Sequence, residues 1–283
     1  MSLGPIARSN PFNSRQVDTG VNSYMKIALI QTDIAWNDPA KNVGACTELA
    51  IQAVSQGAEL LIFPEMFTCG FSLPEGELAQ ASAESGRSFL LSTAKKHTVF
   101  TIGSLPEVSA EGALFNTAYL YRPDGSFESY RKMHLFSYGD ESPRYSPGDQ
   151  TLSVEIGNLR CSIFICYDLR FPVPFHQLAS KTDLFIVVAN WPAARREHWL
   201  TLLKARAIEN QAFVAGVNRV GEGNGLQYSG DSVLFAPDGS ALTELSSAQS
   251  AIVHELDLNQ LLSLRERFPV LQDRRSDLYE KLS

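Results

Sequence analysis

The sequence has no apolar run approaching the ~20 residues that a membrane-spanning helix requires, and no dense stripe of lysine and arginine. The first absence argues against a membrane protein. The second argues against a nucleic-acid partner, as does the excess of 31 acidic over 24 basic residues. No charged-then-apolar segment of the kind that directs secretion opens the chain. We therefore expect a cytoplasmic protein that binds neither membranes nor nucleic acids.

The four cysteines lack the close CxxC pairing that is typical of metal sites. They are Cys46, Cys69, Cys161 and Cys166. Cys161 and Cys166 are five residues apart, so along one strand their side chains point to opposite faces, which argues against a disulfide between them. Without signs of secretion, reduced thiols are expected. The sequence thus gives no indication of a metal centre.

Linkers and repeats are also absent, so the chain of 283 residues is expected to form one large α/β domain. Hydrophobic residues make up 44% of the sequence, which is enough for a sizeable core and argues against disorder. Residues 1–24 differ: they are polar, contain two prolines and show no regular period. We expect 1–24 to be a poorly ordered N-terminal extension or leader, and 25–283 to form the domain with a C-terminal tail.

Buried strands and amphipathic helices alternate along the domain. The apolar runs Lys26–Gln31 and Glu59–Phe63 predict strands, and between them Asp38 and Pro39 predict the start of a helix that ends at Gly57. Further strands are predicted at Val99–Gly103, Leu114–Tyr121, Phe127–Arg131, Leu159–Ile165, Leu184–Ala189 and Phe213–Asn218, and helices at Gly86–Lys96, Val173–Ser180 and Arg196–Asn210. Pro-Asp-Gly turns at 122–125 and 236–239 predict hairpins. Together these indicate a mixed sheet, or two sheets, covered by helices.

Three short segments place reactive side chains at the ends of predicted strands, where α/β folds build their active sites. They are FPEMF at 63–67, YRKMHL at 130–135 and IFICYDLR at 163–170. A lone cysteine is more commonly a small core residue. Cys166, however, ends the most apolar strand shortly before a helix expected near Pro172, a geometry that resembles a nucleophile elbow. We therefore predict that Cys166 is a nucleophile.

A thiol nucleophile needs a base and a counter-charge. Glu65, fixed by Pro64 after a buried strand, would be partly desolvated, which raises the proton affinity of a carboxylate and suits a general base. Within reach of Cys166, the Lys132 ammonium would favour the thiolate and stabilise an oxyanion. The alternatives are an exposed carboxylate at a strand end for Glu65 and a solvated edge-strand lysine for Lys132.

With Glu65, Lys132 and Cys166 in three strand-end motifs (FPEMF, RKMHLF and CYDLRFP), the sequence resembles the nitrilase superfamily of carbon–nitrogen hydrolases from Met25 to the C-terminal tail. The resemblance implies a four-layer αββα sandwich with two mixed sheets and a Glu–Lys–Cys triad that needs no cofactor. It also implies a second glutamate after the lysine segment, matching Glu141. Asp140 beside it leaves open which carboxylate points inward.

The residues after the cysteine indicate a branch of this family. Nitrilases proper follow it with Trp-Glu, whereas this chain has Tyr167-Asp168. CYDLRFP, ANWP at 189–192 and ARAIENQ at 205–211 resemble the omega-amidase and deaminated-glutathione amidase branch. That branch hydrolyses the terminal amide of short 2-oxo acid amides, such as 2-oxoglutaramate or 2-oxosuccinamate, to acid and ammonia through a thioester. The Tyr167 backbone N–H and Lys132 would hold the oxyanion.

Such a substrate carries a carboxylate, which a guanidinium recognises well. Arg170 is the candidate, with a structural ion pair at a helix start as its alternative role. Phe136 and Trp191 could wall the pocket, or belong to the core. His134, two residues from Lys132, is expected to support its loop. The family resemblance also implies at least a homodimer, through the helical face after Cys166.

Other functions are consistent with parts of this pattern. A papain-like Cys–His enzyme would need His134, His176 or His198 beside Cys166. A non-catalytic descendant, serving as a scaffold or binding partner, would tolerate changes at Glu65 and Lys132. An N-carbamoyl amino-acid amidohydrolase would have the same triad with a different pocket.

Overall fold

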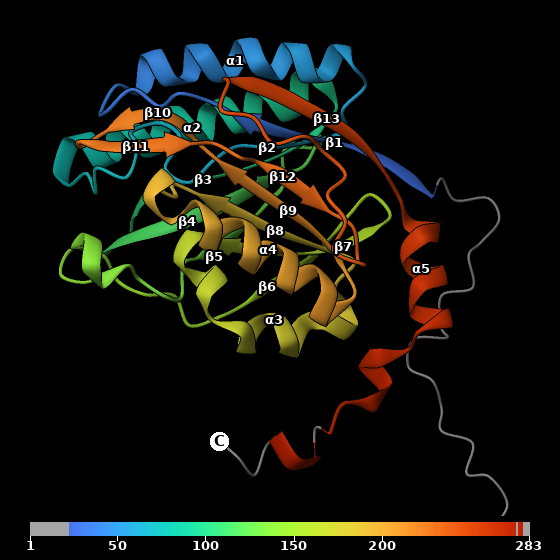
Figure 1. The fold of residues 1–283 in the computed structure, drawn as a ribbon. Coiled ribbons are helices and arrows are strands. Elements are labelled where there is room, and N and C mark those ends of the chain that lie inside the picture. The colour runs from blue at the N-terminus through green and yellow to red at the C-terminus, as the bar shows by residue number, and fades with distance from the viewer. Residues whose placement is uncertain (1–22, 276, 280–283) are drawn as a thin grey trace, which may run out of the picture.

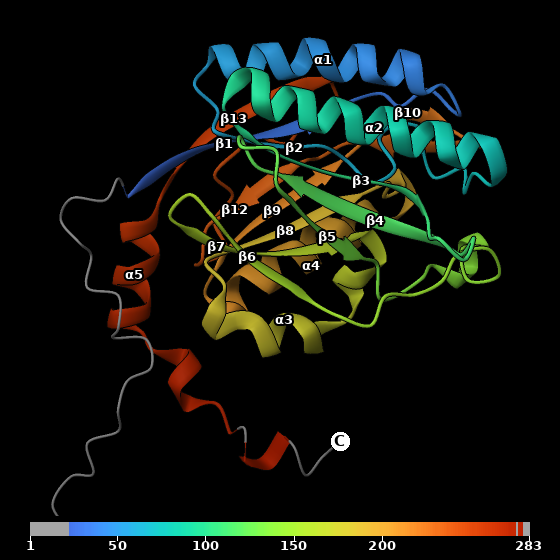
Figure 2. The same ribbon diagram turned by 180° about the vertical axis from the view of Figure 1, so that it is seen from behind.

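The computed structural model describes residues 23–275 and 277–279. They form two β-sheets packed face to face, with helices on both outer faces (Figures 1 and 2). The predicted αββα sandwich with two mixed sheets is therefore confirmed. The predicted extension 1–24 lies almost wholly outside the described residues and stays a prediction, although Tyr24 already belongs to the first strand. Among the described helices, none is long and apolar enough to cross a membrane.

The first sheet has six strands in the order β13-β1-β2-β3-β4-β5. Strands β1, β2 and β3 run parallel, and the other neighbours are antiparallel. Helices α1 and α2 cover its outer face (Figure 2). The bounds are β1 (Tyr24–Gln31), β2 (Leu60–Ile62), β3 (Phe100–Val108), β4 (Leu114–Tyr121), β5 (Phe127–Arg131), β13 (Ser250–Asp257), α1 (Pro39–Ser55) and α2 (Gly76–His97).

The second sheet has five strands in the order β12-β9-β8-β7-β6, with β7, β8 and β9 parallel. Helices α3 and α4 cover its outer face (Figure 1). The bounds are β6 (Leu152–Ile156), β7 (Leu159–Ile165), β8 (Leu184–Ala189), β9 (Phe213–Asn218), β12 (Val233–Phe235), α3 (Pro172–Leu178) and α4 (Arg196–Asn210). A separate hairpin joins β10 (Val220–Gly223) to β11 (Leu226–Ser229), and α5 (Leu258–Arg267) follows β13.

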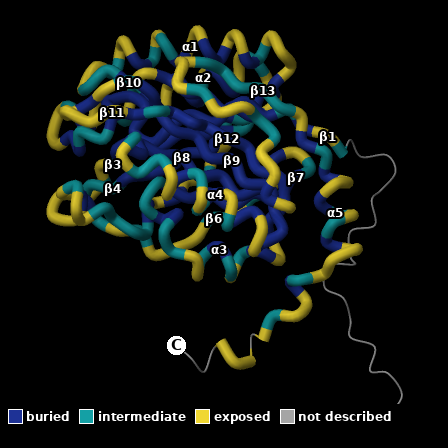
Figure 3. The backbone as a smooth tube through the Cα atoms, viewed as in Figure 1, coloured by how far each residue is buried: buried dark blue, intermediate teal, exposed yellow. Residues whose placement is uncertain are grey.

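Strand β1 shows why the central strands read as unbroken apolar runs. Ile27 and Leu29 point into the core shared with the second sheet, whereas Ala28 and Ile30 point into the core under α1 and α2. Both faces of the strand are thus buried, which is the usual situation of parallel strands in layered α/β folds. Figure 3 shows the result as a continuous dark blue interior, whereas yellow stretches lie on the outer helices.

Some elements differ from the sequence prediction. Helix α2 begins at Gly76 rather than at the predicted Gly86. The sequence pattern did not predict its first part, because small residues such as Ala79 and Ser82 form the buried face there and leave no apolar period. The turn at 236–239 forms, but the strand expected after it is reduced to one bridge between Phe235 and Ala241. Strands β6 and β10 to β13 and helix α5 were not predicted.

Candidate active site

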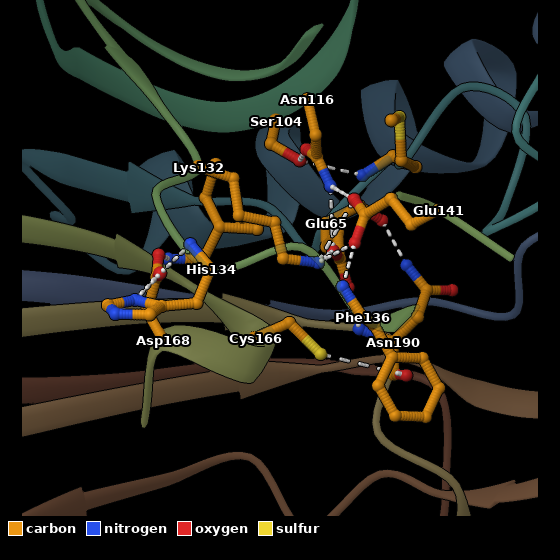
Figure 4. A network of polar contacts seen from close by, with 12 residues as sticks. Glu65, Ser104, Asn116, Lys132, His134, Phe136, Glu141, Cys166, Asp168 and Asn190 are labelled. Atoms are coloured by element: carbon orange, nitrogen blue, oxygen red, sulfur yellow. Dashed lines mark hydrogen bonds and ion pairs between the residues drawn. The ribbon is translucent and has the colours of Figure 1, made fainter. Parts of the chain in front are cut away.

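The carboxyl ends of β2, β5, β7 and β8 meet at one place and bring Glu65, Lys132, Cys166 and Asn190 together (Figure 4). The loop after β5 adds Glu141 to this cluster. The side chains of Glu65, Lys132 and Glu141 are fully buried. Three residues from three separate sequence motifs, with Glu141, thus lie at one point of the fold.

Lys132 lies between two carboxylates. Its Nζ donates to Glu65 Oε1 at 2.9 Å and to Glu141 Oε1 and Oε2 at 3.2 and 2.9 Å. These three bonds match the three N–H groups of an ammonium. Burial opposes the charge, but Glu141 and Glu65 outweigh it and raise the pKa of Lys132. Lys132 is therefore a charged, fully bonded cation and not a solvated surface lysine.

Asn116 in β4 holds both carboxylates in place. Its Nδ2 donates to Glu65 Oε1 at 2.8 Å and to Glu141 Oε1 at 3.1 Å. Its own Oδ1 accepts from Ser104 Oγ at 2.9 Å, which fixes the orientation of the amide. The second oxygen of Glu65 accepts from the backbone N–H of Asn190 at 2.8 Å. The carboxylate that the sequence proposes as a base therefore has a single, fixed position.

Cys166 begins the 3-10 turn η2 (Cys166–Arg170) directly after β7, with a φ of +46°. A positive φ is unusual for a residue with a side chain, and it is a recurring feature of functional turns. Its Sγ lies 4.0 Å from the carbonyl oxygen of Asn190. Cys46, Cys69 and Cys161 are buried, whereas Cys166 is partly exposed. The thiol thus sits on a strand-to-helix turn of the predicted kind, with α3 beginning at Pro172.

Burial, and after it the negative charge of Glu65, raise the pKa of the Cys166 thiol well above its ordinary value. The Lys132 charge acts in the opposite direction but does not offset burial and the negative charge of Glu65. Lys132 therefore lowers the pKa of the thiol, as expected, but not by enough to produce a thiolate in the resting site. In the resting site the thiol holds its proton, and a base must remove it.

Asp168 joins the two segments that carry Lys132 and Cys166. Its Oδ2 accepts from Tyr130 Oη at 2.7 Å and from the Ile165 backbone N–H at 3.0 Å. Its Oδ1 accepts from the His134 backbone N–H at 2.9 Å and lies 2.8 Å from His134 Nδ1. One buried carboxylate thereby fixes the residues on both sides of Lys132 to the turn at Cys166.

The histidines do not lie beside the thiol. His134 contacts Asp168 and stacks on Phe171, with ring centroids 3.9 Å apart. His198 lies on α4, 3.2 Å from an Arg170 nitrogen, and His176 lies on α3 against Tyr279. No hydrogen bond among the described residues joins a histidine to Cys166, so the arrangement does not favour a papain-like pair.

The inward carboxylate after the lysine segment is Glu141. It also accepts from the Phe136 backbone N–H at 2.6 Å, while Asp140 is exposed with a φ of +59°. Glu141 therefore completes the ion cluster, and Asp140 only forms the turn that precedes it.

A cavity of about 110 Å³ opens beside Cys166. Its walls include the aromatic residues that the sequence predicts, Phe136, Tyr167 and Trp191. Arg170 also lines it, with its guanidinium 4.8 Å from the Trp191 ring centroid. The structure thus places all four predicted substrate contacts at the cavity.

The residues at the site that were not predicted include Asn116, Asn190, Arg195 and Tyr228. Asn190 follows β8 as Glu65 follows β2, so its place at a strand end was a usable signal. Its side-chain amide also donates to the carbonyl of Glu65. Asn116 lies inside an apolar strand, and Arg195 and Tyr228 come from short segments without a period. Among the described residues, no group of three or more His, Cys, Asp or Glu side chains is placed to hold a metal ion.

Comparison with known proteins identifies relatives over most of the chain. A family model described as Carbon-nitrogen hydrolase matches residues 26–266. A 2-oxoglutaramate amidase of Bacillus subtilis (strain 168) is 36% identical over 256 residues, covering 89% of this chain and 98% of the relative. Omega-amidase YafV of Escherichia coli (strain K12) is 37% identical over 251 residues, covering 88% and 96%.

Solved structures agree with these relatives. XC1258 from Xanthomonas campestris, a CN-hydrolase superfamily protein with an arsenic adduct in its active site, has a TM-score of 0.82 and 35% identity, covering 89% of this chain and 98% of its own. An amidase from Nesterenkonia sp. AN1, with acrylamide added to its active site cysteine, has a TM-score of 0.80 and 29% identity, covering 92% and 100%. The chain therefore belongs to the carbon–nitrogen hydrolases of the nitrilase superfamily, as its strand-end motifs predicted.

Proposed function

We propose that the protein is an omega-amidase-like enzyme that hydrolyses the terminal carboxamide of a small carboxylate-bearing substrate, 2-oxoglutaramate or 2-oxosuccinamate, to acid and ammonia. The observation that carries this proposal is the buried Glu65–Lys132–Glu141 cluster beside the partly exposed thiol of Cys166. The curated relatives that act on such amides match nearly the whole chain. The roles of the individual residues form part of the proposal.

Glu65 is the base in the first step. Because the Cys166 thiol keeps its proton in the resting site, the proton must leave as the sulfur attacks the amide carbon. The charge of Glu65 acts directly on this thiol, and the carboxylate is held by three hydrogen bonds. The proton passes from Sγ to a Glu65 oxygen while the S–C bond forms and the carbonyl oxygen becomes an oxyanion.

The oxyanion is stabilised by Lys132 and by the backbone N–H of Tyr167, whose position at the start of η2 leaves it without a carbonyl partner inside the turn. At rest, the charge of Lys132 is neutralised by two carboxylates. Once Glu65 is protonated its attraction for Lys132 falls, so the ammonium becomes available at the stage at which the oxyanion forms. Glu141 keeps its own contact and positions Lys132 throughout.

The remaining steps reuse the same carboxyl group. Glu65 returns its proton to the amide nitrogen, the C–N bond breaks, and ammonia leaves a thioester on Cys166. Water then enters, loses a proton to Glu65 and attacks the thioester carbon. The second tetrahedral intermediate collapses, the C–S bond breaks, and the acid leaves with the thiol restored.

The cavity supports this substrate class. Its small volume suits a short acyl group, and its aromatic residues suit the apolar part of such a group. Arg170 is proposed to bind the substrate carboxylate, because no carboxylate among the described residues forms an ion pair with it. An acid with its amide at the other end satisfies both the guanidinium and the nucleophile.

We also propose a homodimer through the face formed by α3 and α4. Val173 and Ile208 are 61% and 49% exposed there, and the family resemblance implies an interface at this face. Light scattering at micromolar concentration should report twice the 31.2 kDa of one chain, and a Val173→Glu variant should shift the protein toward the monomer. A single 31.2 kDa species for the unchanged chain would exclude the dimer.

Ammonia release from a panel of amides tests the function. The panel contains 2-oxoglutaramate, 2-oxosuccinamate, glutamine, deaminated glutathione and an N-carbamoyl amino acid. We expect the two 2-oxo amides to be the best substrates and Cys166→Ala to lower turnover by at least ~10⁴-fold. Cys46→Ala, which removes a buried thiol on α1, is the matched control and should keep turnover.

Two of the alternative enzymes predict different outcomes of the panel or of substitutions tested with it. Preference for the carbamoyl compound would identify an N-carbamoyl amino-acid amidohydrolase. Loss of turnover on alanine substitution of His134, His176 or His198, with Glu65→Gln still active, would favour a Cys–His enzyme. Full turnover by Cys166→Ala would exclude the thioester mechanism.

A further inference from the structure

The cavity wall carries positive charge that the catalytic steps leave unused. Glu65 is the one carboxylate among the residues that line the cavity, and it is already paired with Lys132. Two guanidiniums line it, those of Arg170 and Arg195. Neither forms an ion pair with a carboxylate of the described residues. The cavity therefore favours negative or oxygen-rich groups and disfavours cations.

The backbone of Arg195 is held in place, whereas its guanidinium has no hydrogen-bond partner among the described residues. It is the last residue of the 3-10 turn η4 (Ala193–Arg195), where its carbonyl accepts from Trp191 Nε1 at 2.8 Å. Its guanidinium lies 5.5 Å from the ring centroid of Phe136. None of its side-chain N–H groups donates to a described residue. These donors face a cavity without having a protein partner there.

Tyr228 on β11 likewise combines a fixed position with a donor that has no partner among the described residues. It lines the cavity and is 6% exposed, yet its hydroxyl forms no hydrogen bond within the described part of the chain. The guanidinium of Arg219 lies 4.4 Å from the centroid of its ring. Arg219 is fully buried and donates to the carbonyls of Val220 and Glu222. The tyrosine ring is thus held rigidly while its hydroxyl is left open.

The segments that carry Arg195 and Tyr228 lie next to each other in the fold, and both residues line the same cavity. Strand β11 packs against η4, and Figure 1 shows the β10–β11 hairpin over the start of α4. Burial raises the pKa of Tyr228 to about 12, with Arg219 and Arg195 lowering it and Cys166 and Glu65 raising it. The hydroxyl therefore stays protonated, close to both the reactive cluster and the Arg195 charge.

We propose that Arg195 and Tyr228 form a subsite that binds the 2-oxo oxygen of the substrate and rejects the 2-ammonium group of the matching amino-acid amide. This rests on the proposed function. A carbonyl oxygen accepts hydrogen bonds from both a guanidinium and a phenol, so it gives each of the two unused donors a partner. An ammonium offers only donors and meets the Arg195 charge, so it leaves both donors unsatisfied. Arg170 holds the carboxylate that both compounds share.

Equilibrium binding to the Cys166→Ala chain tests the subsite without turnover. Three ligands share a carboxylate and a terminal amide: 2-oxoglutaramate, glutaramate without the 2-oxo group, and glutamine. Calorimetry should find 2-oxoglutaramate about 10- to 100-fold tighter than glutaramate, and glutamine weakest. Tyr228→Phe and Arg195→Gln, each added to Cys166→Ala, should each reduce the preference for the 2-oxo ligand about tenfold.

The matched control is Arg170→Gln in the same background. It should weaken 2-oxoglutaramate and glutaramate by similar factors and leave their ratio unchanged. Thermal melting of every variant should match that of the parent, since Tyr228→Phe keeps the ring under Arg219 and Arg195→Gln keeps the apolar stem over Phe136.

Two outcomes would overturn the subsite: equal affinity for 2-oxoglutaramate and glutaramate in the parent, or a preference that survives both substitutions. Turnover by the unchanged enzyme answers a separate question. If it releases no ammonia from 2-oxoglutaramate while the binding preference is present and is lost on substitution, the subsite stands and the proposed reaction fails.

Discussion

The buried ion cluster and the cavity wall differ in how many of their polar side-chain atoms have hydrogen-bond partners. Around Lys132, every side-chain oxygen of Glu65 and Glu141 and all three ammonium donors have partners. On the wall, the Arg195 guanidinium and the Tyr228 hydroxyl have none among the described residues. The groups that we propose to act on every substrate are fixed beforehand, which removes their reorganisation cost during reaction. The groups that we propose to select the substrate keep their donors free for it.

The strongest test of this contrast removes the cation of the cluster. Lys132→Met leaves two carboxylates that are 0% exposed without their counter-charge, so we expect a loss of about 3–5 kcal/mol of unfolding free energy. Turnover should fall by at least ~10³-fold. Urea denaturation and ammonia release measure both effects. Lys96→Met, at an exposed position of α2, is the control and should change neither. An unchanged urea midpoint for Lys132→Met would contradict the interdependence of the cluster.

A smaller change within the cluster compares Glu141 with its neighbour. Glu141→Gln keeps an acceptor for the Phe136 N–H but weakens the hold on Lys132, so kcat should fall about 10²-fold. Asp140→Asn changes an exposed carboxylate to an amide that also tolerates the positive φ at this position, and kcat should stay within about twofold. Initial rates at saturating substrate measure both. A larger loss for Asp140→Asn would mean that the inward carboxylate has been misassigned.

The third prediction concerns the proton on Cys166. Burial and Glu65 raise the pKa of this thiol, and Lys132 lowers it. Glu65→Gln removes a raising charge and keeps the lowering one, so the thiol pKa should fall and the thiolate should appear at lower pH than in the unchanged enzyme. Absorbance at 240 nm over a pH series, minus that of the matching Cys166→Ala protein, reports the thiolate. If the midpoint does not move, burial alone sets the pKa.

Sequence reasoning found the parts of the site that lie at strand ends. Glu65 and Cys166 each follow an apolar run that predicts a buried strand, and Lys132 follows a strand that the Pro-Asp-Gly turn at 122–125 predicts, so the sequence indicated both the chemistry and the position of these residues. Several predicted elements match the observed ones closely for the same reason, among them β4, β7 and α4. The same three motifs carry enough information to identify the family.

The remaining features depend on packing that no local pattern records. Asn116 faces the cluster from within an apolar strand, and its role depends on carboxylates that arrive from distant segments. Helix α5 was missed because Arg265, 8% exposed and paired with Asp183, occupies a position on its buried face. Arg195 and Tyr228 line one cavity because β11 packs on η4. Contacts between segments far apart in the chain decided each of these.

The unequal accessibility of the cysteines has a practical consequence. Cys46, Cys69 and Cys161 are enclosed in the folded chain, while Cys166 borders the cavity. A chromogenic thiol reagent added to native protein should thus react with one equivalent per chain, and with four after denaturation. The native stoichiometry counts competent sites directly, so that rates from any preparation can be expressed per working centre instead of per milligram.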